Sequence, residues 1–217
     1  MALMPLAVLM GALPATDAFT ASDGTDLTTY SANWALNNGG TGSLKFSINT
    51  NAVHPNTSGN EIAAHWTADA FANDHYAKGT ISNIANASYV GLAVRAASGS
   101  TYTFYDYNGD GADGSYMSKY VSGSYTALGS AGAVFTTSLA IELHVSGTTI
   151  TPKRGGSTAD IGAQTDSSIA SGSAGISGYG TATGSRLDNW EGGNIGSAAA
   201  SVLWNDRATR FQNLIVR

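Results

Sequence analysis

Hydrophobic and polar residues alternate along most of the chain from residue 16, and no long stretch has the periodicity of a helix. In SLAIELHVSG, every second residue is apolar: Leu139, Ile141, Leu143 and Val145. The segments YVGLAVRA and LKFSI repeat this alternation. Because successive side chains of a strand point to opposite faces, the pattern predicts half-buried β-strands.

The predicted strands follow one another at short, irregular intervals, separated by turn clusters such as NNGGTG, AASGS and VSGTT. Their ranges are 27–36, 44–48, 61–67, 74–84, 89–96, 101–107, 115–121, 124–129, 139–145, 148–154, 175–179 and 185–191. Many short strands without helices between them favour an all-β fold, a two-sheet antiparallel jelly-roll sandwich. Serial repetition is absent from the sequence, which disfavours propellers and solenoids.

Composition and charge exclude several classes of protein. The chain has 217 residues, of which 42% are hydrophobic, enough to bury the core of one domain. Its formal charge is −5 with Lys and Arg scattered singly, so we expect no nucleic-acid partner. The chain has no Cys, which excludes disulfides and thiolate zinc sites.

The first fifteen residues, MALMPLAVLMGALPA, are apolar, and the first basic residue of the chain is Lys45. A signal peptide normally begins with a basic region, and a membrane-spanning helix needs about 20 residues. We therefore expect 1–15 to be an uncleaved apolar arm, with no membrane partner. Contact with a neighbouring subunit is the favoured role, with packing on the domain itself or a residual signal sequence as alternatives.

The two-residue alternation ends after the last predicted strand, and the segment 194–217 has a different pattern. Apolar residues recur there at three- and four-residue steps, which is typical of an amphipathic helix, although an extended arm fits nearly as well. Two apolar arms flanking a domain at 16–193 predict an assembly subunit. The residues expected to make assembly contacts are Leu3, Leu6, Leu9, Leu203, Trp204, Phe211 and Ile215.

The segment DYNGDGADG, residues 106–114, resembles the first half of a calcium loop. Asp106, Asn108 and Asp110 occupy positions 1, 3 and 5 of an EF-hand pattern, but position 12 is Met117 in place of the bidentate Glu. We expect a hairpin connection, because Gly, Asn and Asp suit a tight turn. Weak calcium binding by Asp106, Asn108, Asp110 and Asp113 is the alternative, and no other cofactor is expected.

Catalytic patterns are absent from the sequence. It contains no Glu-x-Asp-x-x-Glu stretch, no G-x-S-x-G elbow and no P-loop. Asp188 and Glu191 are three residues apart and should face opposite sides of a regular strand, whereas Glu142 and His144 should share a solvent-facing side. The four histidines, His54, His65, His75 and His144, have no metal-ligand spacing. We therefore expect no enzymatic activity.

Aromatic residues are concentrated between 102 and 125. Alternation places Tyr102 and Phe104 on one face of their strand and Tyr105 and Tyr107 on the other, so one set should be core and the other surface. Exposed rings can stack on sugar faces. Glycan contact by Tyr105, Tyr107 or Tyr116 is therefore an alternative to ordinary sheet packing.

Three segments resemble the concanavalin A-like, laminin-G-like jelly rolls, particularly the stand-alone domains of tailed bacteriophages: SYVGLAVRAASGSTYTFYDY, SLAIELHVSGTTITPKRGG and SGSAGISGYGTATGSRLDNWEGG. The segment DAFTASDGTDL is similar to the opening strand of that pattern, which lies beside a closing strand, here RLDNWEGG. The resemblance implies that Phe19 and Trp190, on these two strands, are buried.

The resemblance, together with the two arms, implies a non-enzymatic structural protein of a tailed-phage virion. A capsid decoration (cement) protein is the first choice, with partners that are copies of itself and other capsid or tail subunits. The alternative is a carbohydrate-binding, lectin-like module of a tail fibre or of a secreted, extracellular protein, whose partner would be a cell-surface glycan.

Overall fold

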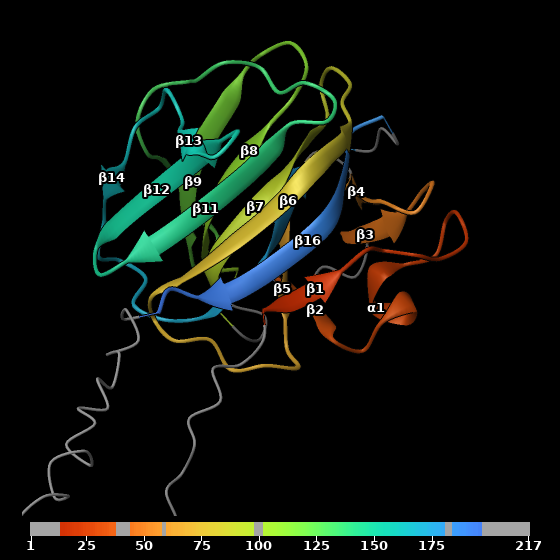
Figure 1. Cartoon of the computed structure of the whole chain (residues 1–217), viewed down its shortest axis with the longest axis horizontal. Coiled ribbons are helices and arrows are strands. Elements are labelled where there is room, and N and C mark those ends of the chain that lie inside the picture. Colours follow the sequence, from red (N-terminus) through yellow and green to blue (C-terminus); the bar gives the residue numbers. More distant parts are fainter. Residues whose placement is uncertain (1–13, 38–43, 58–59, 98–101, 181–183, 197–217) are drawn as a thin grey trace, which may run out of the picture.

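The protein folds as a sandwich of two antiparallel sheets (Figure 1). The structure is a computed structural model that describes residues 14–37, 44–57, 60–97, 102–180 and 184–196. The predicted all-β jelly-roll class is confirmed. Within these ranges, no helix is long and apolar enough to cross a membrane.

The first sheet has nine strands and contains both β1 and β16. Its main order is β13-β12-β11-β6-β16-β4-β3, with β1 paired to β16 and β14 paired to β12. Its strands are β1 (Ala15–Asp17), β3 (Lys45–Ile48), β4 (Val53–Asn56), β6 (His75–Asn83), β11 (Ala140–Ser146), β12 (Thr149–Arg154), β13 (Ser157–Thr158), β14 (Gln164–Thr165) and β16 (Arg186–Asn194).

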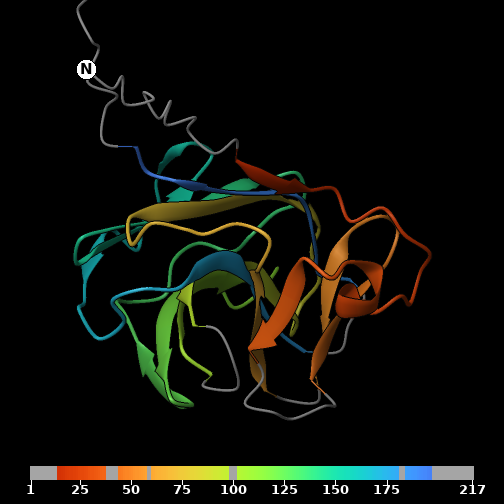
Figure 2. The same cartoon turned by 90° about the horizontal axis from the view of Figure 1, so that it is seen from below.

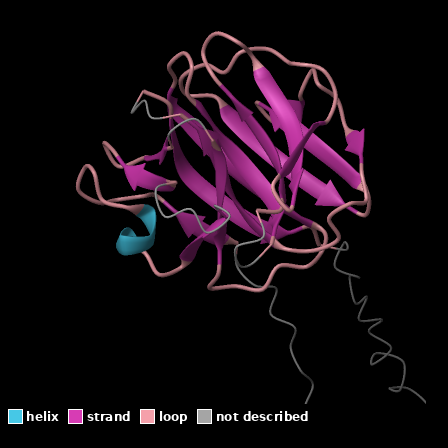
Figure 3. Cartoon of the chain, turned by 180° about the vertical axis from the view of Figure 1, so that it is seen from behind, coloured by secondary structure: helices cyan, strands magenta, loops and turns pink. Residues whose placement is uncertain are grey.

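The second sheet has seven strands in the order β10-β9-β8-β7-β15-β5-β2 and forms the opposite layer, as Figure 2 shows. Its strands are β2 (Trp34–Asn37), β5 (Glu61–Trp66), β7 (Tyr89–Ala96), β8 (Phe104–Gly109), β9 (Ser115–Val121), β10 (Ser124–Ala127) and β15 (Ser173–Tyr179). A single helical turn, α1 (Leu27–Tyr30), lies at one side of the sandwich (Figure 3).

The predicted alternation matches the burial of β11, where Ile141, Leu143 and Val145 are fully buried. The opening and closing strands also pair as the resemblance implied, with Ala15 opposite Gly192. The prediction of one strand over 27–36 is wrong at its start. There the backbone N–H groups of Thr29 and Tyr30 donate to the carbonyl oxygen of Asp26, which forms α1.

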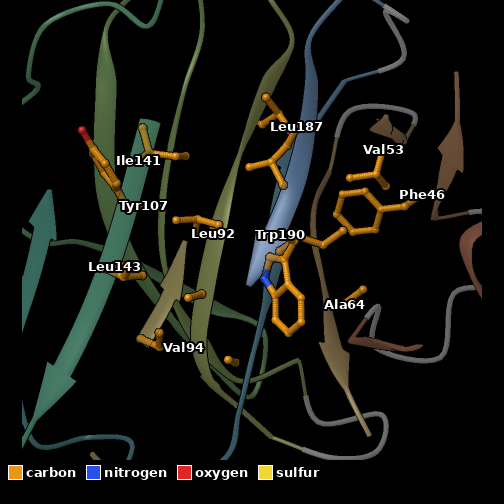
Figure 4. Close-up of a cluster of buried hydrophobic side chains, with 14 of the residues drawn as sticks. Phe46, Val53, Ala64, Leu92, Val94, Tyr107, Ile141, Leu143, Leu187 and Trp190 are labelled. Carbon is orange, nitrogen blue, oxygen red and sulfur yellow. The ribbon is translucent and has the colours of Figure 1, made fainter. Parts of the chain in front are cut away.

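Four aromatic rings fill one end of the core between the two sheets. Trp190 of β16 lies 4.8 Å from Trp34 and 5.5 Å from Trp66, measured between ring centroids, and Phe19 packs on Trp34 at 5.8 Å. The buried positions predicted for Phe19 and Trp190 are confirmed, with 0% and 1% of their surfaces exposed. Figure 4 shows Trp190 in the core.

A bulge in β16 turns Trp190 into this core. Asn189 has a positive φ of 51°, and the register passes from Asp188 opposite Thr80 to Glu191 opposite Lys78.

 Thr80 and Lys78 are two residues apart on β6 and share its outer face, so Asp188 and Glu191 share that face as well. The expectation that these two carboxylates face opposite sides is therefore wrong, because the bulge adds one residue to the strand.

Replacing Trp190 by Ala should lower the free energy of unfolding by about 3–5 kcal/mol, the range for removing a large core aromatic. Chemical denaturation measures this loss. Tyr125→Ala is the matched control, because 58% of the Tyr125 surface is exposed and its removal should change stability by less than about 1 kcal/mol. Equal midpoints for the two variants would contradict the central role of Trp190.

Candidate functional site

A hollow of about 470 Å³ opens on the outer face of the seven-stranded sheet. Five of the ten tyrosines of the chain line it, together with three polar residues. The lining residues are Glu61, Tyr89, Asn108, Tyr116, Ser118, Tyr120, Tyr125 and Tyr179. They come from β5, β7, β8, β9, β10 and β15, so the hollow exists only where these strands are assembled into the sheet.

Strand alternation decides which aromatic residues reach this hollow. On β8, Tyr105 and Tyr107 point into the core and are fully buried, whereas Asn108 lies on the outer face. The expectation that Tyr105 and Tyr107 contact a glycan is therefore wrong. Tyr116, the third residue expected to contact a glycan, does line the hollow from β9.

Small residues in the middle of the sheet let its strands pack closely. Gly91 of β7 lies opposite Asn108 on one side and Ser177 of β15 on the other. A Cβ atom at Gly91 would lie only 2.1 Å from the backbone oxygen of Tyr107, so no larger residue fits there. Gly91 and Ser177 are both buried and do not line the hollow, so these small residues allow β7 to pack closely against β8 and β15 beneath it.

The sheet is concave around this space. Glu61 on β5 and Asn108 on β8 are separated by β15 and β7, which corresponds to about 14 Å of flat sheet at about 4.8 Å per strand. Nevertheless Asn108 Nδ2 donates a hydrogen bond of 2.5 Å to Glu61 Oε1. The strands must therefore curve toward each other on this face.

Two acidic side chains meet at the floor of the hollow. Asp106 is 1% exposed, and its carboxyl group is hydrogen-bonded to that of Glu61. Asn108 Nδ2 also donates to Asp106 Oδ2 over 2.8 Å, and Ser118 Oγ donates to Asp106 Oδ1. Of the two acids, Glu61 is the one that reaches the lining of the hollow.

The pKa values of both acids are raised. Burial raises the pKa of Asp106 to about 7. Burial, followed by the negative charge of Asp106, raises the pKa of Glu61 well above its ordinary value. A carboxyl group removed from water favours its neutral form, and a second carboxylate beside it strengthens this effect. The two groups therefore share protons at neutral pH and titrate as a pair.

The tyrosine rings stand in two groups on either side of the acidic pair. Tyr89 is 5.9 Å from both Tyr116 and Tyr179, measured between ring centroids. On the other side, Tyr120 is 5.5 Å from Tyr125. Tyr125 is the large hydrophobic residue that stands out as exposed in the described part of the chain. Such rings offer flat surfaces to a ligand in the hollow.

The sequence did not single out most of these residues. Glu61 begins the segment EIAAHW, whose apolar residues predict a strand. Nothing in this segment indicates a partner for the Glu61 carboxyl group. Tyr89 and Tyr179 lie opposite each other in the sheet, although they are ninety positions apart in the chain. Only the pairing of β15 with both β5 and β7 brings these residues to one place.

The segment 106–114 forms a hairpin, as expected, because β8 pairs with β9 and Gly109 lies opposite Ser115. Its first four residues, however, belong to β8, so the connection itself is 110–114. The carboxylate of Asp110 accepts hydrogen bonds from the backbone N–H groups of Ala87, Ala112 and Asp113. These bonds hold the turn together.

The four residues of the calcium alternative lie in two places. Asp106 and Asn108 are at the floor of the hollow, whereas Asp110 binds backbone N–H groups of the turn. Asp113 Oδ2 accepts a hydrogen bond of 2.9 Å from the hydroxyl of Tyr89. Across the described ranges, no group of three or more His, Cys, Asp or Glu residues is arranged to hold a metal ion.

The histidines lie away from the hollow. His54, His65 and His75 are buried, and burial lowers the pKa of His75 to about 4. His144 Nε2 lies 2.6 Å from Glu142 Oε2 on the other sheet. The expectation that Glu142 and His144 share a face is therefore met by their contact.

The residues expected to make assembly contacts all lie outside the described residues. They are Leu3, Leu6, Leu9, Leu203, Trp204, Phe211 and Ile215. Their role in assembly stays a prediction from the sequence.

Comparisons with known proteins show the fold. No family model and no curated protein matches the chain. Among solved structures, the carbohydrate binding module CBM66 from Bacillus subtilis superposes with a TM-score of 0.56 and 11% identity, covering 73% of this chain and 95% of that one. A Bacillus subtilis protein of unknown function with a galectin-like fold gives a TM-score of 0.51 and 10% identity, covering 80% and 97%. The chain therefore has a jelly-roll sandwich fold similar to these structures.

Thermal unfolding should give the same melting temperature in millimolar calcium and in excess chelator, because Asp110 already binds three backbone N–H groups. Asp110→Ala should lower the melting temperature equally in both solutions, since it removes the support of the turn. A rise in melting temperature with calcium that Asp110→Ala abolishes would show that the loop is a metal site.

The acidic pair predicts a pH dependence of stability. The folded pKa values of Glu61 and Asp106 lie above the ordinary values near 4, so their contribution to stability is fully present below about pH 4 and is lost as the pH rises through the folded values, about 7 for Asp106. Glu61→Gln removes one of the two charges. Its melting temperature should therefore rise relative to the parent between pH 5 and pH 8.

The quantity to measure is the difference in melting temperature between Glu61→Gln and the parent protein. The absolute melting temperature is less informative, because titration of the buried histidines changes stability with pH in the opposite direction. The lowered pKa values of His54, His65 and His75 make the folded state lose stability on acidification below about pH 6.5. Both proteins share this effect, and it cancels in the difference. A difference in melting temperature that is the same at both pH values would contradict the proton-sharing pair.

Proposed function

We propose that this domain binds carbohydrate in the tyrosine-lined hollow of its seven-stranded sheet. The observation that carries the proposal is the combination of five tyrosine rings with Glu61, Asn108 and Ser118 in one concave space of about 470 Å³. Ligand pockets commonly have volumes of about 300–1,000 Å³, with mostly apolar walls and a few polar groups that fix the orientation of the ligand.

The chemistry of a sugar ring suits these walls. Its C–H faces pack on aromatic rings, and its hydroxyl groups exchange hydrogen bonds with amide, hydroxyl and carboxyl groups. In the hollow, Tyr116, Tyr120 and Tyr125 offer rings, and Asn108 and Ser118 offer polar atoms. The groups needed for both kinds of contact are therefore close together.

The similarity to CBM66 supports this proposal only at the level of the fold. That protein is a carbohydrate binding module by its description, and its identity to this chain is 11%. The residues that would select a sugar must therefore be read from this chain alone. They are the lining residues of the hollow.

The acidic pair favours binding over hydrolysis. Glycosidases separate their two catalytic carboxyl groups by about 5 Å or more, so that the bond to be cut fits between them. Glu61 and Asp106 are instead hydrogen-bonded to each other. We therefore propose a non-enzymatic binding module.

The cellular setting rests on the sequence alone. A tail fibre or a secreted protein would use such a module to bind a cell-surface glycan. A capsid decoration protein, the first expectation from the sequence, would display the same sandwich on a virion. The virion location and the contacts with capsid or tail subunits rest on the phage resemblance and on the two arms, and they stay predictions.

Removing a ring from the hollow should weaken glycan binding. A glycan array identifies a bound glycan, and calorimetric titration then compares the variants. We expect Tyr116→Ala and Tyr125→Ala each to lower the affinity about 3- to 10-fold, since one aromatic contact contributes about 0.5–1.5 kcal/mol.

The matched control is Tyr76→Ala, which removes a half-buried ring that stacks on His144 on the other sheet. It should leave the affinity unchanged. Equal losses in all three variants, or no binding to any glycan of the array, would contradict the proposed site.

A further inference from the structure

We propose that the glycan bound in the hollow carries a protonated amine, as a glucosamine with a free amino group does. The inference rests on the proposed function and names the chemical class of its ligand. It is carried by an acidic floor that no Lys or Arg of the described residues contacts and by aromatic rings on both sides of that floor.

Among the described residues, the acidic pair has no cationic partner. The side-chain donors that reach Asp106 and Glu61 are the amide of Asn108 and the hydroxyl of Ser118, and both are neutral. A buried carboxylate is costly unless it is paired with a positive charge. A ligand that brings an ammonium group beside Glu61, the acid that reaches the hollow, would supply the missing charge.

The lysines and arginines of the described ranges make their contacts elsewhere. Lys45 pairs with Asp26, Lys78 with Glu191, Lys119 with Asp166 and Lys153 with Glu142, while Arg95 and Arg154 donate to backbone oxygens and Arg186 to Asn49. The other three basic residues of the chain are Arg207, Arg210 and Arg217, in the range 197–217. The short internal ranges that are not described contain no Lys or Arg.

This distribution of charge distinguishes between classes of sugar. A sugar carboxylate or sulfate would meet the acidic pair with no lysine or arginine among the lining residues to offset the repulsion. A neutral sugar would keep its hydrogen bonds but would leave the acidic floor without a counter-charge. A sugar with a protonated amine would keep these hydrogen bonds and would also supply the counter-charge.

The tyrosine rings strengthen the same preference. Rings attract a cation placed over their faces, and this attraction is stronger where water is excluded. Tyr120 and Tyr125 stand next to the acidic pair. Burial, followed by the negative charges of Glu61 and Asp106, raises the pKa of Tyr120, so the field of the acids extends to the rings.

Calorimetric titration of the whole protein with a β-1,4-linked glucosamine tetramer and with its fully N-acetylated counterpart tests the inference. The two probes differ only in the charge and acetylation of the amine. At pH 7 we expect the glucosamine tetramer to bind at least ~10-fold more tightly, and this advantage should shrink with added salt, which screens charge. The affinity for the N-acetylated tetramer should hardly depend on salt.

Glu61→Gln should reduce the affinities for the two tetramers to within ~2-fold of each other, because the ammonium group loses its counter-charge. The matched control is Glu142→Gln, which makes the same change of formal charge on the other sheet and should keep the preference. Melting curves of both variants show whether each is folded.

The outcomes separate this inference from the proposed function. Equal affinity for the two tetramers, or binding to neutral glycans of the array without binding to the glucosamine tetramer, would overturn the amine preference and leave glycan binding standing. A preference that survives Glu61→Gln in a folded protein would also overturn it. No binding to any glycan would overturn both proposals.

Discussion

The packing of Trp190 between the two sheets is the contact on which the rest of the fold depends. Its ring meets Trp34 and Trp66 of the opposite sheet, and its indole N–H donates to the carbonyl oxygen of Gly175 over 3.1 Å. Gly175 belongs to β15, the central strand that pairs with β5 and β7. The tryptophan thus links β16, an interior strand of the first sheet, to β15 of the second sheet, which contributes Tyr179 to the hollow.

The hollow depends on what each strand of the second sheet carries on its outer face. Five tyrosines line it together with Glu61, Asn108 and Ser118, and these side chains come from six of the seven strands of this sheet. Concave curvature then brings Glu61 within hydrogen-bond distance of Asn108 across two intervening strands. A flat sheet with the same residues would hold these side chains apart and would have no shared floor.

The acidic pair is a feature that stability alone does not explain. Burying two carboxyl groups beside each other raises both pKa values and makes their ionised forms unfavourable at neutral pH. Perturbed titratable groups of this kind are concentrated at functional sites. A ligand with a positive charge would stabilise the ionised form of these acids. The electrostatics of the floor therefore favour the amine-bearing ligand proposed for the hollow.

The sequence by itself determined the class of the fold, because a two-residue period in hydrophobicity fixes which face of each strand is buried. Its Gly, Asn and Asp residues also predicted the hairpin after β8, whereas the pairing of the first and last strands was implied only by the family resemblance. It did not determine which alternating set of aromatics on β8 faces outward, and only the structure shows that Tyr105 and Tyr107 belong to the core. Nor did it reveal Glu61 as the partner of Asp106, because that contact joins strands that are neighbours only through β15 and β7. Long-range strand order, sheet curvature and the bulge at Asn189 are properties of the assembled sandwich, and these decided where the site lies.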